Sequence, residues 1–258
     1  MKKKKRIRII PSILIDNQKM IKGKNFQNHK YLGDIFNAVR IYSNKKSHEL
    51  IILDKSARAQ SRLFDSNLLR KISSEIFMPI TVGGNIQTVK DAKKLINSGA
   101  EKIYLNSTII DNYNLIKDIA SEIGNQSIVV GVDVKLVDGN YQIFIDNGKK
   151  FYDKKIFQHL NSIVSSGAGE IILNSISKEG TKTGFDINLY KKVENDFDLP
   201  IIASGGASCF ESFTELFDKT KLSAAAASSV FSLFGLNEAV LISYFSEKKL
   251  EELINKYE

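Results

Sequence analysis

The sequence predicts an α/β fold in which eight strand–helix units close into a single (β/α)₈ barrel, a TIM barrel. The chain has 258 residues, close to the roughly 250 that such barrels contain. Short apolar runs without polar alternation, which are typical of buried parallel strands, are followed by segments with helical spacing. Two of these runs, at 79–82 and 200–204, end at a glycine pair and lead into a helical segment, so one arrangement occurs in both halves of the chain.

The composition is that of a globular protein with a sizeable core, with 43% hydrophobic and 26% charged residues. No apolar run approaches the ~20 residues of a membrane-spanning helix. Met1 and the basic residues after it resemble the start of a signal peptide, but the apolar run that follows is broken at 16–19. We therefore expect a cytoplasmic protein without a membrane partner. The single cysteine, Cys209, excludes an internal disulfide and a cysteine-rich metal site.

The net charge of +8 and the pI of 9.3 are compatible with either nucleic acid or anionic small molecules as partners. Apart from the N-terminal run the lysines are scattered, and no nucleic-acid-binding motif occurs. These observations favour an anionic substrate and no nucleic acid.

In the first half, apolar runs mark the strands and recurrent apolar residues three and four positions apart mark the helices. The expected strands are 6–15, 49–54, 80–82 and 103–106, and the expected helices are 31–45, 66–76, 87–98 and 113–123. Residues 16–23 are expected to form a hairpin turn after the first strand.

The second half repeats this order. The expected strands are 127–135, 170–174, 201–204 and 223–227, and the expected helices are 154–166, 187–193, 210–217 and one or two within 238–257. A small hairpin is expected at 136–146, because Asp138 and Gly139 form a turn dipeptide.

The two halves align at one offset. The segment that begins at Glu49 matches the one that begins at Glu170, and Pro79 matches Pro200, so both offsets are 121 (170 − 49 and 200 − 79). Strand–helix units resemble one another in any such protein, but the glutamate and proline matches favour duplication. We expect half-barrels of about 1–124 and 125–258.

Active sites of such barrels lie at the C-terminal ends of the strands, and two carboxylates are found there. Asp133 follows four apolar or small residues, so desolvation is expected to raise its pKa and favour a role as general acid or base. The alternative is a structural carboxylate bonded to loop amides or to Lys135. For Asp54 a structural ion pair with Lys55 or Arg58 is as plausible as a functional role.

Two glycine pairs are candidate phosphate cradles, because glycine lets backbone N–H groups approach an anion. The glycine- and hydroxyl-rich loop 177–184 suits a phosphate as well, although a plain flexible loop is the alternative. Lys22 and Lys24 are candidates to reach the same anion. None of the histidines, His29, His48 and His159, follows a predicted strand, which disfavours a metal site or histidine-based catalysis.

Four segments, 124–135, 167–174, 180–186 and 201–207, resemble the cyclase subunit (HisF) family of imidazole glycerol phosphate synthase, a half-duplicated (β/α)₈ barrel of histidine biosynthesis. The resemblance covers nearly the whole chain. It implies a heterodimer with a HisH-like glutaminase subunit that makes ammonia from glutamine. The ammonia passes through the barrel to a small-molecule substrate with a phosphate at each end, without cofactor or metal.

The resemblance also assigns residues. It implies Asp133 as a catalytic aspartate and Lys22 as the lysine of the first loop. Around one phosphate it implies Gly84, Asn85 and Ser107. Around the other it implies Gly180, Thr181, Gly205, Gly206, Ser228 and Ser229. A charged ring that gates ammonia at the other end of the barrel is implied at Arg8, Glu49, Lys102 and Glu170.

The chain departs from the family pattern at the first strand, where the family's other catalytic aspartate is replaced by Leu14. Asn85 and Ser208 replace family glycines. These changes resemble a divergent branch found in surface-polysaccharide gene clusters, and we expect an ammonia-accepting amidotransferase subunit that amidates or amidinates an anionic sugar or nucleotide sugar. The alternatives are the histidine-pathway cyclase itself and a non-catalytic scaffold that activates a glutaminase.

Overall fold

The computed structural model describes residues 6–110, 112–235 and 237–257, and it contains the predicted barrel. Eight parallel strands pair in chain order, and the last pairs with the first, which closes the sheet. These strands are β1 (Arg8–Asp16), β4 (Leu50–Asp54), β5 (Ile80–Gly83), β6 (Lys102–Leu105), β7 (Ile128–Val137), β10 (Glu170–Ser175), β11 (Ile201–Ser204) and β12 (Ala224–Ala227). The fold class expected from the sequence is confirmed. The basic run at 1–5 lies outside the described residues.

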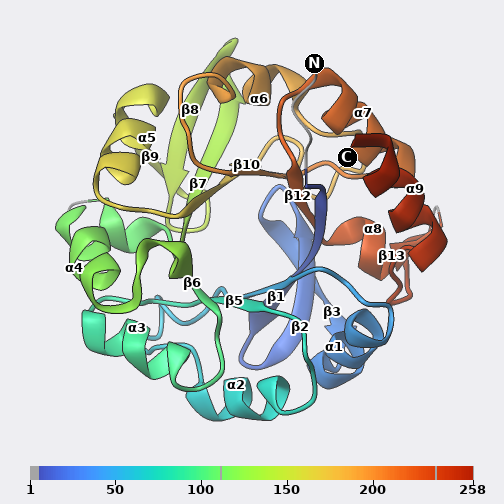
Figure 1. Ribbon diagram of the computed structural model, residues 1–258, viewed down its shortest axis with the longest axis horizontal. Helices are drawn as coiled ribbons and strands as arrows, with labels where there is room; N and C mark the ends of the chain where they lie inside the picture. Colours follow the sequence, from blue (N-terminus) through green and yellow to red (C-terminus); the bar gives the residue numbers. More distant parts are fainter. Residues whose placement is uncertain (1–5, 111, 236, 258) are drawn as a thin grey trace.

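Helices surround the strands as an outer ring (Figure 1). They are α1 (Ile35–Asn44), α2 (Ser66–Ser73), α3 (Val89–Ile96), α4 (Asn114–Ile123), α5 (Ile156–Ser165), α6 (Ile187–Val193), α7 (Phe210–Lys219), α8 (Ser229–Ser232) and α9 (Glu247–Tyr257). Short 3₁₀ turns lie at Ser107–Ile109 and Asn125–Ser127. Several helices begin at a residue whose side chain accepts a hydrogen bond from a first-turn N–H, as Asp34, Asp65 and Thr88 do.

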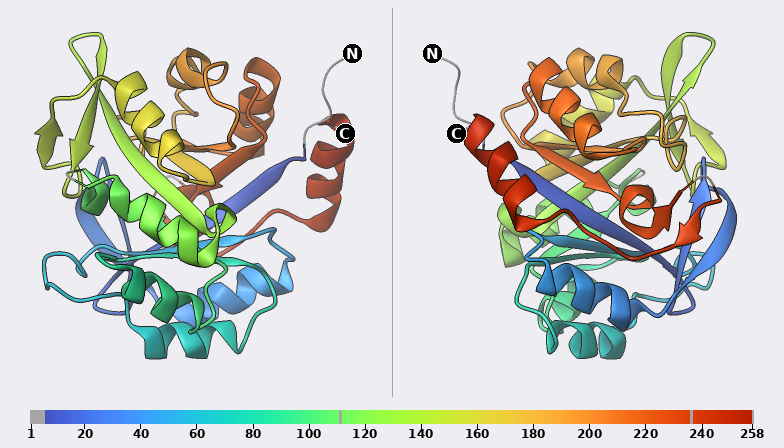
Figure 2. Two further views of the ribbon diagram at one scale, coloured as in Figure 1. Left: turned by 60° about the vertical axis from the view of Figure 1, so that its left-hand side comes forward. Right: turned by 90° about the vertical axis from the view of Figure 1, so that its right-hand side faces the viewer.

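Two antiparallel hairpins extend from the same end of the barrel (Figure 2). In one, β1 pairs with β2 (Lys19–Lys24), which pairs with β3 (Gln27–Gly33). In the other, β7 pairs with β8 (Asn140–Ile145), which pairs with β9 (Lys150–Tyr152). A third, small pair is formed by β13 (Leu233–Phe234) and β14 (Ala239–Val240).

The boundaries from the sequence were wrong at three places. The expected hairpin turn at 16–23 is confined to residues 17 and 18, because Lys19–Lys24 forms β2. The expected helix 31–45 begins only at Ile35, because Tyr31–Gly33 belongs to β3, a largely exposed strand without an apolar pattern. The expected helical segment 238–257 contains β14, and its helix begins at Glu247. The hairpin around Asp138 and Gly139 is confirmed.

The two halves of the barrel have equivalent strand registers. Across β1, β4, β5 and β6 the aligned residues are Leu14, Leu53, Gly83 and Tyr104. Across β7, β10, β11 and β12 they are Asp133, Asn174, Ser204 and Ala226. We propose on this basis that the chain is one barrel domain made of two repeated halves, about 1–124 and 125–258.

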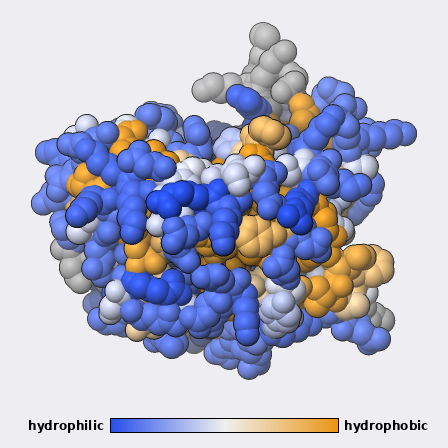
Figure 3. All heavy atoms as spheres, turned by 90° about the horizontal axis from the view of Figure 1, so that it is seen from below, coloured by the Kyte–Doolittle hydropathy of each residue, from blue (hydrophilic) through white to orange (hydrophobic). Residues whose placement is uncertain are grey.

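The hydrophobic core has two parts. The larger lies between the strands and the helices and contains Tyr42, Phe64, Tyr190, Phe213 and Phe231. The smaller lies inside the barrel and consists of Ile10, Ile51, Val129, Ile172, Ile202, Ala224 and Ala226. Outside, the face that carries α2 is mostly hydrophilic, with separate hydrophobic areas between the charged groups (Figure 3). In the described part of the chain, no helix has the length and apolar character needed to cross a membrane.

Candidate active site

A cavity of about 200 Å³ opens at the C-terminal ends of the barrel strands. It is lined at its floor by the interior side chains Ile51, Tyr104 and Ile172. Leu14 and Asp133, the paired positions of the two halves, both line it. The cavity therefore brings the predicted acid/base residue and the departure from the family pattern into one space.

Asp133 is a buried carboxylate whose two oxygens are each held by an amide. Asn106 Nδ2 donates to Oδ2 at 2.8 Å, and Asn174 Nδ2 donates to Oδ1 at 2.8 Å. Burial raises the pKa of Asp133, and the two hydrogen bonds oppose this shift without cancelling it. The partners considered for the alternative, structural role, loop amides and Lys135, are not those observed: Asn174 lies on β10 and Asn106 directly follows β6.

Leu14 occupies the corresponding place on β1, opposite Leu53 on β4. In the second half, the strand register places the Asp133 carboxylate beside the Asn174 amide. At the equivalent place in the first half, the register puts two apolar side chains, Leu14 and Leu53, beside each other. The place that corresponds to the Asp133 carboxylate is therefore apolar in the first half.

The predicted first phosphate cradle lies at the ends of β5 and β6. Gly84, Asn85 and Ser107 all line the cavity. Asn85 has a left-handed backbone (φ 54°), and its Oδ1 accepts from Gln87 Nε2 at 3.0 Å. Ser107 Oγ accepts from the backbone N–H of Asp146 at 3.0 Å, which joins the β8–β9 turn to this edge. The three residues are therefore brought together, and Asn85 adds a side chain to this edge of the cavity.

The second cradle is formed by the glycine pair after β11. Gly205 and Gly206 have φ values of 94° and 103°, which favour glycine. A Cβ on Gly206 would lie 2.1 Å from the carbonyl oxygen of Gly184, so the loop 177–184 packs directly on the pair. Gly180 lies in this loop against Gly23, where its Cβ would be 2.5 Å from the Gly23 carbonyl oxygen.

The hydroxyl groups of this cradle differ in their bonding. Thr181 Oγ1 donates to the Lys178 carbonyl at 2.8 Å and stays within the loop. Ser228 lines the cavity at the end of β12. Ser229 Oγ is buried and has no hydrogen-bond partner among the described residues. A buried hydroxyl without a partner is costly, but Ser229 is not among the residues that line the cavity, whereas Ser228 is.

Lys22 lies on β2 and is buried at the cavity, where its ammonium contacts the Glu179 carboxylate. Burial lowers the pKa of Lys22 to about 8. The backbone N–H of Asn25 also donates to the Glu179 carbonyl at 2.9 Å. The first hairpin and the loop after β10 are thereby joined across the mouth of the cavity. Lys24, the other candidate of this loop, is exposed.

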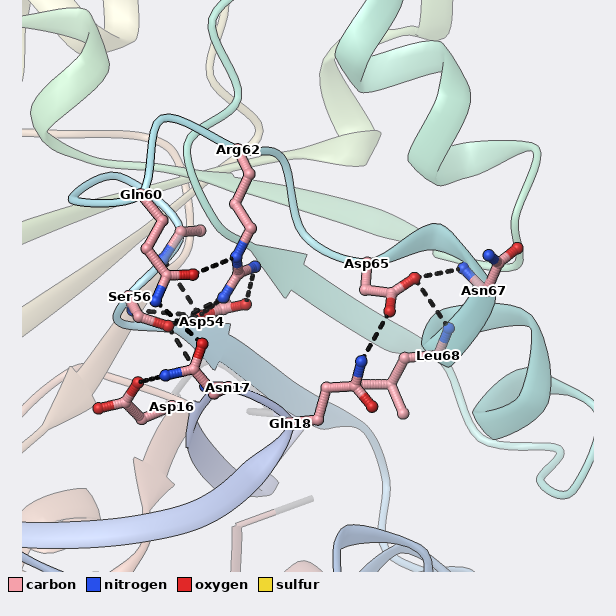
Figure 4. A network of polar contacts seen from close by, with 11 residues as sticks. Asp16, Asn17, Gln18, Asp54, Ser56, Gln60, Arg62, Asp65, Asn67 and Leu68 are labelled. Atoms are coloured by element: carbon pink, nitrogen blue, oxygen red, sulfur yellow. Dashed lines mark hydrogen bonds and ion pairs between the residues drawn. The ribbon is translucent and has the colours of Figure 1, made fainter.

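Asp54 belongs to a structural network (Figure 4). Arg62 holds both of its oxygens, at 2.6 Å and 3.3 Å, and the backbone N–H groups of Ser56 and Ala57 donate to Oδ1. The ion pair anticipated as one possibility is thus present, with Arg62 rather than Lys55 or Arg58 as its cation. Arg58 pairs with Asp146 instead, at 3.0 Å.

Four charged side chains form a closed ring at the opposite end of the barrel, as predicted. Arg8 contacts Glu49 at 2.6 Å and Glu170 at 2.7 Å, and Lys102 contacts the same carboxylates at 3.2 Å and 2.8 Å. Their side chains are largely buried. Burial would raise the pKa of Glu49, but Arg8 and then Lys102 outweigh it, and the pKa lies below its ordinary value.

The charged ring is expected to make stability depend on pH. Because the pKa of Glu49 is lower when folded, its contribution is complete above the unfolded value of about 4.3 and is lost as the pH falls through the folded value. Glu49→Gln is expected to lower the free energy of unfolding by about 1–3 kcal/mol at neutral pH. The difference from the unsubstituted protein should shrink in urea unfolding at about pH 3.

Glu215→Gln is the matched control, because Glu215 pairs with Lys219 at 2.6 Å on the exposed face of α7. Its expected cost is at most about 0.5 kcal/mol. Equal costs for the two variants, or a Glu49→Gln difference that does not change with pH, would contradict the assignment.

His29 was not expected at the site, yet it lines the cavity. It lies on β3, and its Nδ1 is 3.2 Å from Lys55 Nζ. Burial, and then Lys55, lower its pKa. His29 reaches the cavity because β3 folds back on β2. The residues of β3 are mostly exposed and show no strand pattern, so the sequence did not indicate this hairpin. Among the described residues, no group of three or more His, Cys, Asp or Glu side chains is placed to hold a metal ion.

Comparisons with known proteins show the family to which the chain is similar. Residues 8–235 match the family described as "Histidine biosynthesis protein". A protein of Pseudomonas aeruginosa named "Putative imidazole glycerol phosphate synthase subunit hisF2" is 36% identical over 247 residues, which are 95% of this chain and 98% of that protein. The imidazole glycerol phosphate synthase subunit HisF of Streptococcus mutans is 38% identical over 225 residues, 87% of this chain and 90% of the relative. A HisF protein of Leuconostoc mesenteroides is 38% identical over 226 residues, 87% of this chain and 89% of the relative.

Proposed function

The chain belongs to the histidine biosynthesis protein family and, within it, to the HisF-like subunits of imidazole glycerol phosphate synthase, and from this we propose that it is an ammonia-using cyclase subunit. In this proposal, the lone pair of ammonia attacks a carbonyl carbon of a phosphate-bearing substrate within the cavity, the carbon–oxygen double bond opens, and the oxygen leaves as water once it is protonated. Asp133 accepts and returns the protons, and the nitrogen is supplied by a glutaminase subunit of the HisH kind. No cofactor takes part.

The observation that carries the proposal is the setting of Asp133. A carboxylate with a raised pKa is a better base than an ordinary aspartate, and burial raises the pKa of Asp133. Asn106 and Asn174 fix both oxygens, so the carboxylate does not have to reorient during a proton transfer. The cavity that it faces is open to a small molecule.

The two cradles support a substrate with two anionic ends. The first offers Gly84, Asn85 and Ser107 at one edge of the cavity. The second offers the N–H groups of Gly205 and Gly206 and the hydroxyl of Ser228, with Gly180, Thr181 and Ser229 nearby. Lys22 would add a cation between the hairpin and the loop. Backbone N–H groups and hydroxyls are suitable donors to phosphate oxygens.

The charged ring supports a supply of ammonia from the far end of the barrel. It surrounds the barrel axis on the side away from Asp133, where a second subunit could dock. Four buried charges are costly to retain in a fold that does not use them, because each must be desolvated. We propose Arg8, Glu49, Lys102 and Glu170 as the gate through which ammonia passes.

Leu14 favours a second candidate function, ammonia transfer to a different acceptor. A leucine cannot exchange protons, so a cyclisation that needs two carboxylates lacks one of them. The expected acceptor was an anionic sugar or nucleotide sugar of polysaccharide synthesis. The names of the relatives give that acceptor no support, and they fit the histidine alternative better. We therefore place the histidine-type reaction first.

Turnover by the purified chain distinguishes the two candidates. With ammonium chloride and the histidine-pathway intermediate that such cyclases convert, we expect imidazole glycerol phosphate to form, at a rate limited by the missing carboxylate. Product can be followed by mass spectrometry, with the same mixture lacking ammonium as the control. If the folded protein forms no product at saturating ammonium, the cyclase proposal fails and the second candidate is favoured.

A further inference from the structure

Tyr104 is an aromatic side chain inside the barrel, between the charged ring and Asp133. It lies on β6 between Lys102 of the ring and Asn106, which donates to Asp133. It lines the floor of the cavity and packs on the smaller apolar cluster. The equivalent position of the other half, by strand register, is Ala226. The barrel interior therefore has one large polar-tipped side chain that its own repeat lacks.

Two glycines make room for this ring. A Cβ on Gly131 would lie 1.7 Å from the Tyr104 hydroxyl oxygen, and a Cβ on Gly83 would lie 2.7 Å from Tyr104 Cδ1. Neither glycine has a left-handed backbone, so space is the reason for glycine here. The phenol is thus held in a fixed place at the level of Gly131, two residues before Asp133 on β7.

The hydrogen bonds of the phenol leave its proton available. Asn106 Nδ2 donates to the Tyr104 oxygen at 3.1 Å and to Asp133 at 2.8 Å. The Asp133 carboxylate thereby fixes which end of the Asn106 amide faces Tyr104. No acceptor for the Tyr104 O–H is found among the residues that the structure describes. Burial, and then the charge of Asp133, raise the pKa of Tyr104, so the hydroxyl remains protonated.

A phenol in this state can distinguish the two forms of ammonia. Neutral ammonia has a lone pair that accepts a hydrogen bond, whereas the ammonium ion, like a lysine side chain, has only donors. One lone pair of the phenol oxygen is already used by Asn106. The free O–H can therefore donate a hydrogen bond to ammonia, whereas ammonium can use only the remaining lone pair of the oxygen.

We propose that the Tyr104 hydroxyl is an ammonia-binding group, which holds neutral ammonia in the barrel interior beside Asp133. The inference rests on the proposed use of ammonia by this chain, and it adds a residue that determines which nitrogen species reaches the carboxylate. The hydroxyl can bind ammonia from either end of the barrel, whether the ammonia enters through the charged ring or through the open mouth of the cavity.

Binding can be measured without turnover. The protein is labelled with ¹³C at the ζ carbon of its nine tyrosines, and the Tyr104 signal is assigned by its loss in Tyr104→Phe. In a mildly alkaline buffer, ammonium chloride is expected to shift the Tyr104 signal in a saturable way, while potassium chloride at the same concentration does not. The Tyr244 signal should not move, because its hydroxyl donates to the Ile9 carbonyl at 2.8 Å. No specific shift at Tyr104 would overturn the inference.

Kinetics give a second readout in the ammonium-dependent reaction. Tyr104→Phe is expected to raise the KM for ammonia about 3- to 10-fold, the effect of one neutral hydrogen bond, with kcat nearly unchanged. The control Tyr244→Phe removes a buried hydroxyl outside the barrel and should leave both constants unchanged. A loss of kcat alone would contradict ammonia binding. A protein that shifts the Tyr104 signal but forms no imidazole glycerol phosphate would refute the proposed cyclase reaction and leave this inference intact.

Discussion

Asp133→Asn is expected to lower ammonium-dependent turnover about 10²–10⁴-fold, the usual contribution of a general acid or base. Asparagine has nearly the same shape, but it cannot carry a proton between ammonia and the substrate. It also places an NH₂ group opposite one of the two amides that now donate to the carboxylate. The measurement is kcat with ammonium chloride as the nitrogen source, together with urea unfolding to show that the variant is folded.

Asp186→Asn is the matched control, because Asp186 is also buried and accepts hydrogen bonds from Tyr141 and Ser175. It caps α6, so its loss should reduce stability and leave kcat of the folded protein within a few-fold. If Asp133→Asn retained full turnover in the reconstituted glutaminase complex, the chain would be a scaffold rather than the catalytic subunit.

Leu14→Asp is expected to have the opposite effect and to raise the rate of imidazole glycerol phosphate formation by about 10²-fold or more. The new carboxylate would line the cavity at the place that is equivalent, in the other half, to Asp133. A second proton-transferring group would then act from the opposite side of the substrate. The measurement is kcat with ammonium chloride and the histidine-pathway intermediate.

Leu53→Asp tests whether any added carboxylate suffices. Leu53 lines the same cavity one strand away, opposite Leu14 in the register. The Leu53→Asp variant should not raise the rate, because position 53 is equivalent to Asn174 in the other half and not to Asp133. If neither variant changes the rate while both remain folded, the missing carboxylate is not the limit, and an acceptor other than the histidine-pathway intermediate becomes the better proposal.

The parts of the fold that were predictable are those set by local sequence patterns. Buried parallel strands are marked by apolar runs in the sequence. Asp133 follows such a run, so it could be placed at the mouth of the barrel. The charged ring followed from the resemblance, and the four side chains do meet.

The parts that were missed depend on residues distant in the chain. β3 is mostly exposed and has no alternating pattern, so its fold-back, and with it the place of His29, is set by pairing with β2 rather than by its own residues. Tyr104 read as an ordinary strand residue, because its position in the barrel interior depends on glycines in β5 and β7. Lys22 on β2 contacts Glu179 in the loop after β10, and these two residues are 157 positions apart in the chain. No local sequence pattern indicates such a contact.

The charged ring also restricts which sequence changes the barrel can accept over time. Each cation touches both anions and each anion touches both cations, so the loss of one member leaves two neighbours with an uncompensated charge. Reversing two adjacent signs does not repair the ring, because it leaves one contact between two cations and one between two anions. Among relatives, Arg8, Glu49, Lys102 and Glu170 should therefore vary as a correlated set, and only the reversal of all four signs should restore a fold that a single reversal destroys.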